Sequence, residues 1–194
     1  MGVPKEVASR NRQAIIETAA RVFRERGVDG VGVADLMKEA GFTHGGFYNH
    51  FESKDALAAE ACAAAFSNNA CHMKQLVAES GGDRAVALQA LVDGYLSSEQ
   101  CGTPGLACPT GTLAVDAARQ GKQMQEAYTA GVSAMLDVLQ EQLYPGAPDG
   151  RDKAITVLAN LVGHIVIARG VSAVDPDLAQ EVLAAGRAHL GRGE

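Results

Sequence analysis

A cluster of small and polar residues lies between two apolar patterns near the start of this 194-residue chain. Its members are Thr43, His44, Gly45, Gly46, Tyr48, Asn49, His50 and Lys54. Their hydroxyl, amide, imidazole and ammonium groups suit the base edges and phosphates of double-stranded DNA. The paired glycines cost a helix about 1 kcal/mol each relative to alanine, but they let the backbone approach a partner closely. The cluster therefore predicts a DNA-reading surface, with an ordinary cap on a helical protein as the alternative.

Two short helices joined by a tight turn would position this cluster. Residues 33–40 carry apolar side chains at helical spacing, and Gly41 stands where a helix end favours positive φ. Thr43 is expected to cap the second short helix, in which Phe47 and Phe51 would point into a small core. This pattern predicts a helix-turn-helix. A third helix would follow the motif, capped by the hydroxyl of the next serine in the chain.

Residues 27–57 resemble the DNA-binding domain of TetR-type transcriptional regulators. The resemblance rests on Gly41-Phe-Thr-His-Gly-Gly-Phe-Tyr-Asn-His-Phe51 and on Ser53-Lys-Asp-Ala-Leu57. It implies that the residues approaching base edges are Thr43, His44 and Gly45. It implies that the residues contacting phosphates are Tyr48, His50 and Lys54. Two positions depart from the family's pattern: Gly32 replaces a usual Ser or Thr cap, and His44 replaces a usual basic residue.

The net charge of −6 and the isoelectric point near 5.4 are unusual for a protein that binds nucleic acid. The charge is unevenly distributed, however. Residues 1–54 carry 8 basic and 7 acidic side chains, whereas the remainder carries 9 basic and 16 acidic ones. The acidity thus belongs to the part that need not approach DNA. With a net charge of only +1 in the first part, binding is expected to be strongly salt-sensitive.

The whole chain is predicted to be all-α, with about nine helices and no strand pattern. A helix-turn-helix domain is expected at 1–53 and a helical ligand-binding and dimerisation domain at 54–194. Apart from the short helix after Thr43, the expected helices are 9–26, 33–40, 54–79, 83–96, 109–119, 122–143, 151–169 and 176–190. Residues 1–8 are expected to form a loose arm, with Lys5, Arg10 and Arg12 free to contact phosphates; a frayed terminus is the alternative.

No apolar run is expected to reach membrane-spanning length, and the N-terminus lacks the apolar core of a signal peptide. A cytoplasmic protein without a membrane partner is therefore expected. The helix at 151–169 is apolar around much of its circumference, more than one neighbour requires. The resemblance implies that this helix and 176–190 form a four-helix interface in a homodimer, with internal core as the alternative. The two reading surfaces would then lie about 34–36 Å apart.

The middle helices, at about 83–143, are expected to enclose the site of an unidentified small-molecule effector. Candidate lining residues are Met73, Tyr95, Leu96, Cys108, Leu113, Met124, Tyr128, Met135 and His164. Methionine and aromatic side chains at helical spacing also suit plain core packing, so that alternative applies to each of them.

The four cysteines show no metal-binding spacing, and no metal or other cofactor is expected. Cys62 and Cys71 are nine residues apart on one helix, about 13 Å along its axis, so they cannot bridge each other. Cys108 precedes Pro109 at a helix start, where the positive helix end favours the reactive thiolate. Cys101 lies across a short Gly/Pro loop. An alternative function is therefore a redox- or electrophile-sensing regulator that switches through Cys108, with Cys101 as its partner.

Together, these features predict a non-enzymatic homodimeric repressor that a ligand releases from its double-stranded DNA operator. Ligand binding would shift the helix after Ser53 and change the separation of the two reading surfaces. A small-molecule-binding protein or a thiol peroxidase without gene control is the alternative from another class. No phosphate-binding loop or Ser/His/Asp pattern supports catalysis. Activation in place of repression also remains open.

Overall fold

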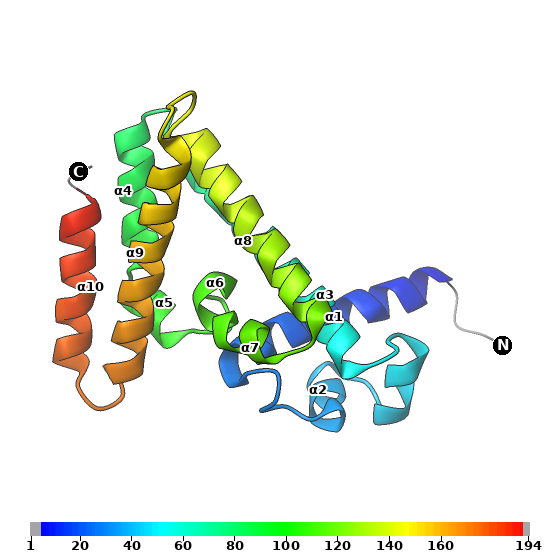
Figure 1. The fold of residues 1–194 in the computed structure, drawn as a ribbon. Helices are drawn as coiled ribbons and strands as arrows, with labels where there is room; N and C mark the ends of the chain where they lie inside the picture. The colour runs from blue at the N-terminus through cyan, green and yellow to red at the C-terminus, as the bar shows by residue number, and fades with distance from the viewer. Residues whose placement is uncertain (1–4, 192–194) are drawn as a thin grey trace.

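In the computed structural model, which describes residues 5–191, all regular structure is helical (Figure 1). This part of the chain contains ten α-helices and one 3₁₀ helix, where about nine helices were expected. The all-α prediction is confirmed. The additional helix is α5 (Ser98–Gly102), which begins because the Ser97 hydroxyl accepts a hydrogen bond of 3.1 Å from the backbone N–H of Gln100. A second difference is a break within the helix expected at 109–119.

The N-terminal elements are α1 (Lys5–Arg26), α2 (Val33–Glu39), the 3₁₀ helix η1 (His44–Asn49) and the start of α3 (Lys54–Glu79). They pack around one shared cluster of fully buried side chains: Ile15, Phe23, Leu36, Met37, Phe47 and Leu57. We call these elements, residues 5–57, the reading head. Gly27 and Gly41 adopt positive φ values of +75° and +84°, and there the chain leaves α1 and α2.

The prediction of a loose arm at residues 1–8 is wrong for residues 5–8, because α1 already begins at Lys5. Residues 1–4 lie outside the described residues. Arg12 is not a free cation either. Its guanidinium pairs with Glu60 at 2.6 Å, donates to the His50 carbonyl at 3.3 Å, and lies 4.7 Å from the centre of the Phe51 ring. Arg12 therefore ties α1 to α3 and to the end of η1.

The remaining helices are α4 (Arg84–Tyr95), α6 (Pro109–Thr112), α7 (Ala114–Arg119), α8 (Lys122–Leu143), α9 (Gly150–Val171) and α10 (Pro176–Leu190). Helix α3 runs alongside α8 from the reading head into this body, while α4, α9 and α10 lie at the opposite end (Figure 1). The α3–α8 pair approaches closely at Gly131, where a β-carbon would lie only 2.2 Å from the ring of Phe66. Long-range shifts of α3 must therefore involve α8.

Side-chain caps begin four of the described helices: α3, α4, α5 and α10. The Ser53 hydroxyl accepts from the N–H of Ala56 at 3.0 Å, and the carboxylates of Asp83 and Asp175 cap α4 and α10. Thr43, in contrast, makes no side-chain cap bond to η1, so the expected cap is absent. Pro109 begins α6 as predicted, but the helix expected at 109–119 is divided at Leu113, which is fully buried and has non-helical backbone angles between α6 and α7.

The helix predicted at 151–169 runs two residues further than expected: α9 continues to Val171, and the Ser172 N–H closes it on the Ala168 carbonyl. Among the described residues, α9 is the one helix long and apolar enough to cross a membrane by length and composition. This corrects the expectation that no apolar run reaches that length. A core helix of a soluble protein passes the same test, and here α9 packs against both α8 and α10.

Candidate DNA-binding face and effector cavity

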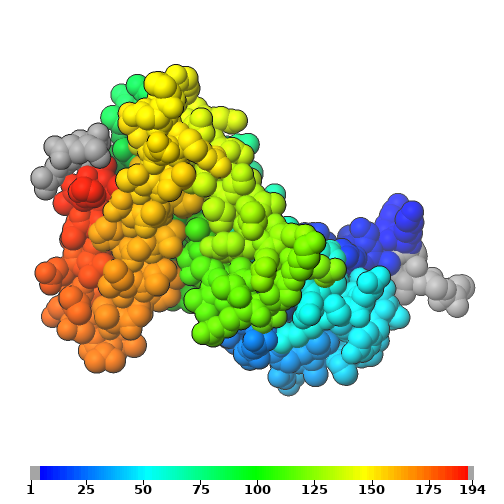
Figure 2. Space-filling view, viewed as in Figure 1, coloured from blue at the N-terminus to red at the C-terminus, as the bar shows by residue number. Residues whose placement is uncertain are grey.

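The candidate DNA-binding residues surround η1, at the end of the molecule opposite α9 and α10 (Figures 1 and 2). The exposed members are Thr43, His44, Gly45, Tyr48 and Asn49. The partly exposed members are Gly46, His50 and Lys54. Together they form what we call the η1 face. Beneath it, Phe47 and Phe51 are buried, with ring centres 5.6 Å apart, so the short helix is held from inside the reading head.

The two glycines of the η1 face are not required by the packing of the fold. A β-carbon at Gly45 would have no neighbour within 4 Å. At Gly46 it would meet the Thr43 hydroxyl at 3.7 Å and the Met37 methyl at 3.9 Å, which are ordinary contacts. Neither residue has positive φ. Their smallness therefore leaves a bare backbone surface on η1, which is what close approach to a partner requires.

Tyr48 is the large side chain on this surface. It is 68% exposed, although the edge of its ring rests on Phe47 with 5.2 Å between ring centres. A phenol held at its base and free at its hydroxyl can donate to a phosphate with little loss of side-chain freedom. Lys54 is the first residue of α3, directly after the Ser53 cap. Its ammonium thus lies at the positive end of a long helix, where an anion is favoured.

Two arginines of the reading head are paired with carboxylates within it. Arg21 lies 2.7 Å from Glu39 and 3.0 Å from Glu25, and Arg26 lies 3.2 Å from Glu39. These guanidinium groups lower the pKa of the Glu39 carboxyl, with the Arg21 hydrogen bond as the main cause. The pairs sit on α1 and α2. They fix the orientation of α2, on which η1 rests, and their positive charge is locally balanced.

A cavity of about 390 Å³ opens in the body between α3, α4 and the segment that carries α5. The lining residues are Asn69, His72, Met73, Leu76, Leu91, Gly94, Tyr95, Ser97, Glu99, Gln100 and Cys108. Of the predicted effector residues, the structure brings Met73, Tyr95 and Cys108 together here. Helical periodicity did not predict that Asn69, Glu99 and Gln100 line this cavity. Their place in its wall depends on how α3 packs beside the segment that carries α5.

The other predicted effector residues lie elsewhere. Leu96, Leu113, Met124 and Met135 are fully buried core residues. Tyr128 donates a 2.7 Å hydrogen bond to the Thr110 carbonyl, and the ring centre of Phe66 lies 5.5 Å from its own. Burial raises the pKa of the Tyr128 hydroxyl to about 12. His164 Nδ1 lies 2.7 Å from the Asn160 carbonyl oxygen on α9. These groups pack the body around the cavity without lining it.

Two polar atoms at the cavity lack a partner. Asn69 Oδ1 and the Tyr95 hydroxyl oxygen are buried and make no hydrogen bond. Burial holds the Tyr95 pKa well above its usual value, with a further contribution from the neighbouring Cys108 thiol. Unpaired buried polar atoms are uncommon, so these two are candidates for hydrogen bonds to a bound molecule or to water.

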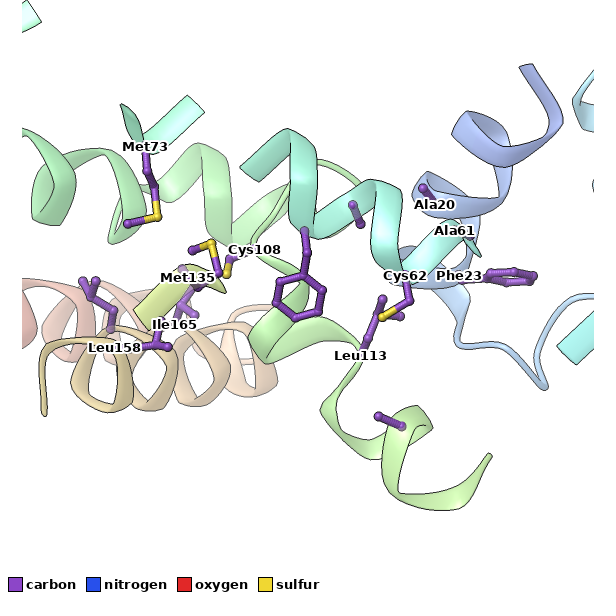
Figure 3. Close-up of a cluster of buried hydrophobic side chains, with 14 of the residues drawn as sticks. Ala20, Phe23, Ala61, Cys62, Met73, Cys108, Leu113, Met135, Leu158 and Ile165 are labelled. Carbon is purple, nitrogen blue, oxygen red and sulfur yellow. The ribbon is translucent and has the colours of Figure 1, made fainter. Parts of the chain in front are cut away.

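The four cysteines are free thiols, and only Cys71 is exposed. Cys101 and Cys108 are 6% and 5% exposed, and Cys108 belongs to the same buried cluster as Met73 and Met135 (Figure 3). Burial raises the pKa of the Cys62 thiol to about 12, so that thiol is inert. Residues 5–191 contain no group of three or more His, Cys, Asp or Glu side chains that could hold a metal ion.

Residues 103–119 connect the cavity with the reading head. Beside Cys108, the Ala107 carbonyl accepts a 2.8 Å hydrogen bond from Arg24 of α1. Burial lowers the pKa of this guanidinium, which also donates to the Ala20 carbonyl. Asp116 of α7 accepts a 2.8 Å bond from the Val28 N–H, just after α1. The cavity wall therefore contacts the reading head independently of α3.

Comparison with known proteins adds independent evidence. Residues 15–61 match the family model described as bacterial regulatory proteins, tetR family. The HTH-type transcriptional repressor DhaR of Mycobacterium sp. (strain GP1) is 30% identical over 105 residues, which are 54% of this chain and 51% of that protein. The HTH-type transcriptional regulator LmrA of Bacillus subtilis (strain 168) is 26% identical over 155 residues, covering 77% and 80%. The chain thus aligns with about half the length of DhaR.

Solved structures show the same fold. A TetR transcriptional regulator from Legionella pneumophila superimposes with a TM-score of 0.78 at 14% identity, covering all of this chain and 99% of its own. The reduced form of E. coli NemR gives a TM-score of 0.75 at 21% identity, covering 91% of this chain and 94% of its own. The helical arrangement is therefore shared along nearly the whole chain.

Proposed function

We propose that this chain, which belongs to the tetR family of bacterial regulatory proteins, is a homodimeric repressor that a small molecule releases from its operator. The observation that carries the proposal is the η1 face. Gly45 is exposed and Gly46 partly exposed, neither is required by the packing, and Tyr48 and Lys54 flank them. DNA binding also places the protein with the chromosome, in the cytoplasm.

On this proposal, Thr43, His44 and Gly45 approach base edges in the major groove, because recognition helices read bases through their N-terminal residues. Gly46 gives the backbone room beside them, and Asn49 offers an amide that can bond a base or the backbone of DNA. Tyr48, His50 and Lys54 contact phosphates and set the register. Because Arg12 and Arg21 are paired with carboxylates, Lys54 supplies salt-dependent affinity together with the exposed cations Arg10 and Lys38.

The proposed dimer interface lies on α9 and α10. These helices pack against each other and leave large apolar side chains exposed: Ile155 at 47%, Val166 at 43%, Ile167 at 56% and Leu178 at 40%. Figure 2 shows α9 and α10 forming an outer wall at the end of the molecule away from the reading head. Pairing of this wall across a two-fold axis would bury the apolar residues and present two heads to one duplex.

Two routes support release by a ligand. Helix α3 contributes Asn69, His72 and Met73 to the cavity, and its first residue is Lys54 of the η1 face. The segment 103–119 contributes Cys108 to the cavity and is bonded to α1 through Ala107 and Asp116. A ligand that moves either element would change the angle of the reading head. Two heads held by one dimer then cannot meet both half-sites.

Replacing Lys54 by alanine should weaken binding to a duplex from the gene's own upstream region about tenfold, and lower the salt slope by about 2 for the dimer. The reason is the loss of one phosphate contact per protomer. A gel-shift titration at several salt concentrations measures both quantities. Lys74→Ala, on an exposed part of the same helix, is the matched control and should bind like the parent. Equal affinity of Lys54→Ala and the parent would refute the assignment.

A thiol switch is the second candidate, and it is favoured by one observation: of the four cysteines, Cys108 lines the cavity. The Cys108 sulfur would attack a ring carbon of a quinone that enters the cavity. A carbon–sulfur bond forms, and the thiol proton passes to the quinone to leave a hydroquinone thioether. Cys108 also adjoins Ala107, whose carbonyl holds Arg24, so the added bulk would disturb the reading head.

Replacing Cys108 by serine should then abolish release of DNA by p-benzoquinone, measured by gel shift, with at least about a tenfold difference in the quinone concentration required. Cys71→Ser, which removes the exposed thiol, should leave the response unchanged. Release of Cys108→Ser at the parent's quinone concentration would exclude the switch. Peroxide turnover by the purified protein would instead support the thiol peroxidase alternative.

A further inference from the structure

The cavity presents two unpaired polar atoms on neighbouring helices. Asn69 Oδ1 comes from α3 and can only accept a hydrogen bond, whereas the Tyr95 hydroxyl comes from α4 and can donate or accept. Both atoms are buried, so an absent partner leaves them desolvated at a free-energy cost. A bound molecule that supplies an N–H or O–H to Asn69 removes part of that cost. The same molecule can accept a hydrogen bond from the Tyr95 hydroxyl, through a second oxygen or through the hydroxyl that donates to Asn69.

The charges around the cavity disfavour an anionic ligand. No lysine or arginine is among the lining residues, and the one lining carboxylate is Glu99. Two guanidinium groups lie near the wall, but both are engaged by backbone oxygens. Arg169 donates to the carbonyls of Gln100 and Cys101, and Arg24 to that of Ala107. A buried carboxylate on the ligand would therefore lack a lysine or arginine partner, and the imidazole of His72, which also lines the cavity, is exposed to solvent.

The rest of the lining is apolar and adaptable. Met73 and Leu76 on α3 and Leu91 on α4 form the hydrophobic part, and Cys108 adds a thiol. Methionine can adjust to ligands of different outline. At about 390 Å³, the cavity lies at the small end of the range for organic ligands.

We propose that the effector is an uncharged, compact organic molecule whose N–H or O–H group donates to Asn69 Oδ1 beside the Tyr95 hydroxyl, with its apolar body against α3 and α4. The inference rests on the proposed function and names the chemical class of its effector. It assigns Asn69 and Tyr95 as the residues that select for the hydrogen-bonding group, and the absence of a lining lysine or arginine, together with the lining Glu99, as the feature that rejects acids.

Three probes of matched shape test this class: 2-naphthol, naphthalene and 2-naphthoate. Equilibrium dialysis of the full-length protein measures the affinity for each. The expected order places 2-naphthol about tenfold or more ahead of naphthalene, with 2-naphthoate weakest. In Tyr95→Phe and Asn69→Leu, the advantage of 2-naphthol over naphthalene should fall to about threefold or less. Tyr144→Phe removes a hydroxyl at the far end of α8 and is the matched control, in which the preference should persist.

Tighter binding of 2-naphthoate than of 2-naphthol would overturn the inference, as would no binding of any probe. An unchanged preference in both Tyr95→Phe and Asn69→Leu would overturn it as well. Far-ultraviolet circular dichroism of each variant verifies that the helices are retained. Dialysis is done without DNA, so its outcome is independent of the gel shift. A protein that selects 2-naphthol but ignores its upstream duplex would contradict the proposed function alone.

Discussion

Replacing Gly45 by glutamate should abolish binding to the upstream duplex, with an affinity loss of about 100-fold or more, while the free protein unfolds at the parent's temperature. A side chain fits at this position because a β-carbon there has no neighbour within 4 Å. In the complex, however, one carboxylate per head would stand between the backbone of η1 and the DNA. It would add bulk and repel phosphates in both half-sites of a dimer.

Gly45→Ala and Gly81→Glu are the controls for this substitution. Alanine adds only a methyl group and should reduce affinity far less than glutamate. Gly81 follows α3 in an open turn of the body, so glutamate there adds the same charge away from the η1 face. Because Gly81 has a φ of +66°, a side chain there is strained, and Gly81→Glu should be less stable than Gly45→Glu. Gly81→Glu should nevertheless still bind DNA. Retained affinity in Gly45→Glu would mean that η1 does not face DNA.

Replacing Ile167 by glutamate should convert the dimer into a monomer at micromolar concentration and weaken operator binding about 100-fold or more. Ile167 is 56% exposed on α9 in one protomer, in the wall proposed to pair. A two-fold interface would bury two carboxylates without partners, which costs several kcal/mol. A monomer would then bind one half-site only. Sedimentation velocity gives the assembly state, and a gel shift gives the affinity.

Val86→Glu is the matched control for the interface. Val86 is an aliphatic residue on α4 that is 51% exposed, so the substitution adds the same charge at a similar exposure outside the α9–α10 wall. It should remain a dimer and bind DNA. A dimeric Ile167→Glu protein would place the interface elsewhere and remove the geometric basis for two coupled heads.

The reading head was predictable because its signals are local. Gly41 has the positive φ that its position indicated, Ser53 caps α3, and Phe47 and Phe51 are buried as their four-residue spacing implied. Each of these depends on residues a few positions away. Arg12 shows the limit of such reasoning, because its partner Glu60 is 48 residues distant. A cation that looked free in the sequence is therefore bound inside the domain.

The cavity was less predictable for the same reason. Helical periodicity indicates which side of a helix is apolar, but it does not indicate which helices meet there. Tyr95 and Cys108 lie on the cavity, whereas Leu96, one residue further along α4's end, is fully buried in the core. Nothing in the sequence indicated that the Asn69 amide oxygen would be buried without a hydrogen-bond partner. The break at Leu113, a fully buried residue, had no local signal in the sequence.

We propose that two copies of the η1 face bind one duplex together. Hydroxyl-radical footprinting of the upstream duplex, with native mass spectrometry of the same complex, tests it directly. We expect an even number of protomers per duplex and protected half-sites about 10–10.5 base pairs apart, or a multiple of that spacing, both lost in Gly45→Glu. A single protomer on the duplex, or a footprint that persists in Gly45→Glu, would contradict it.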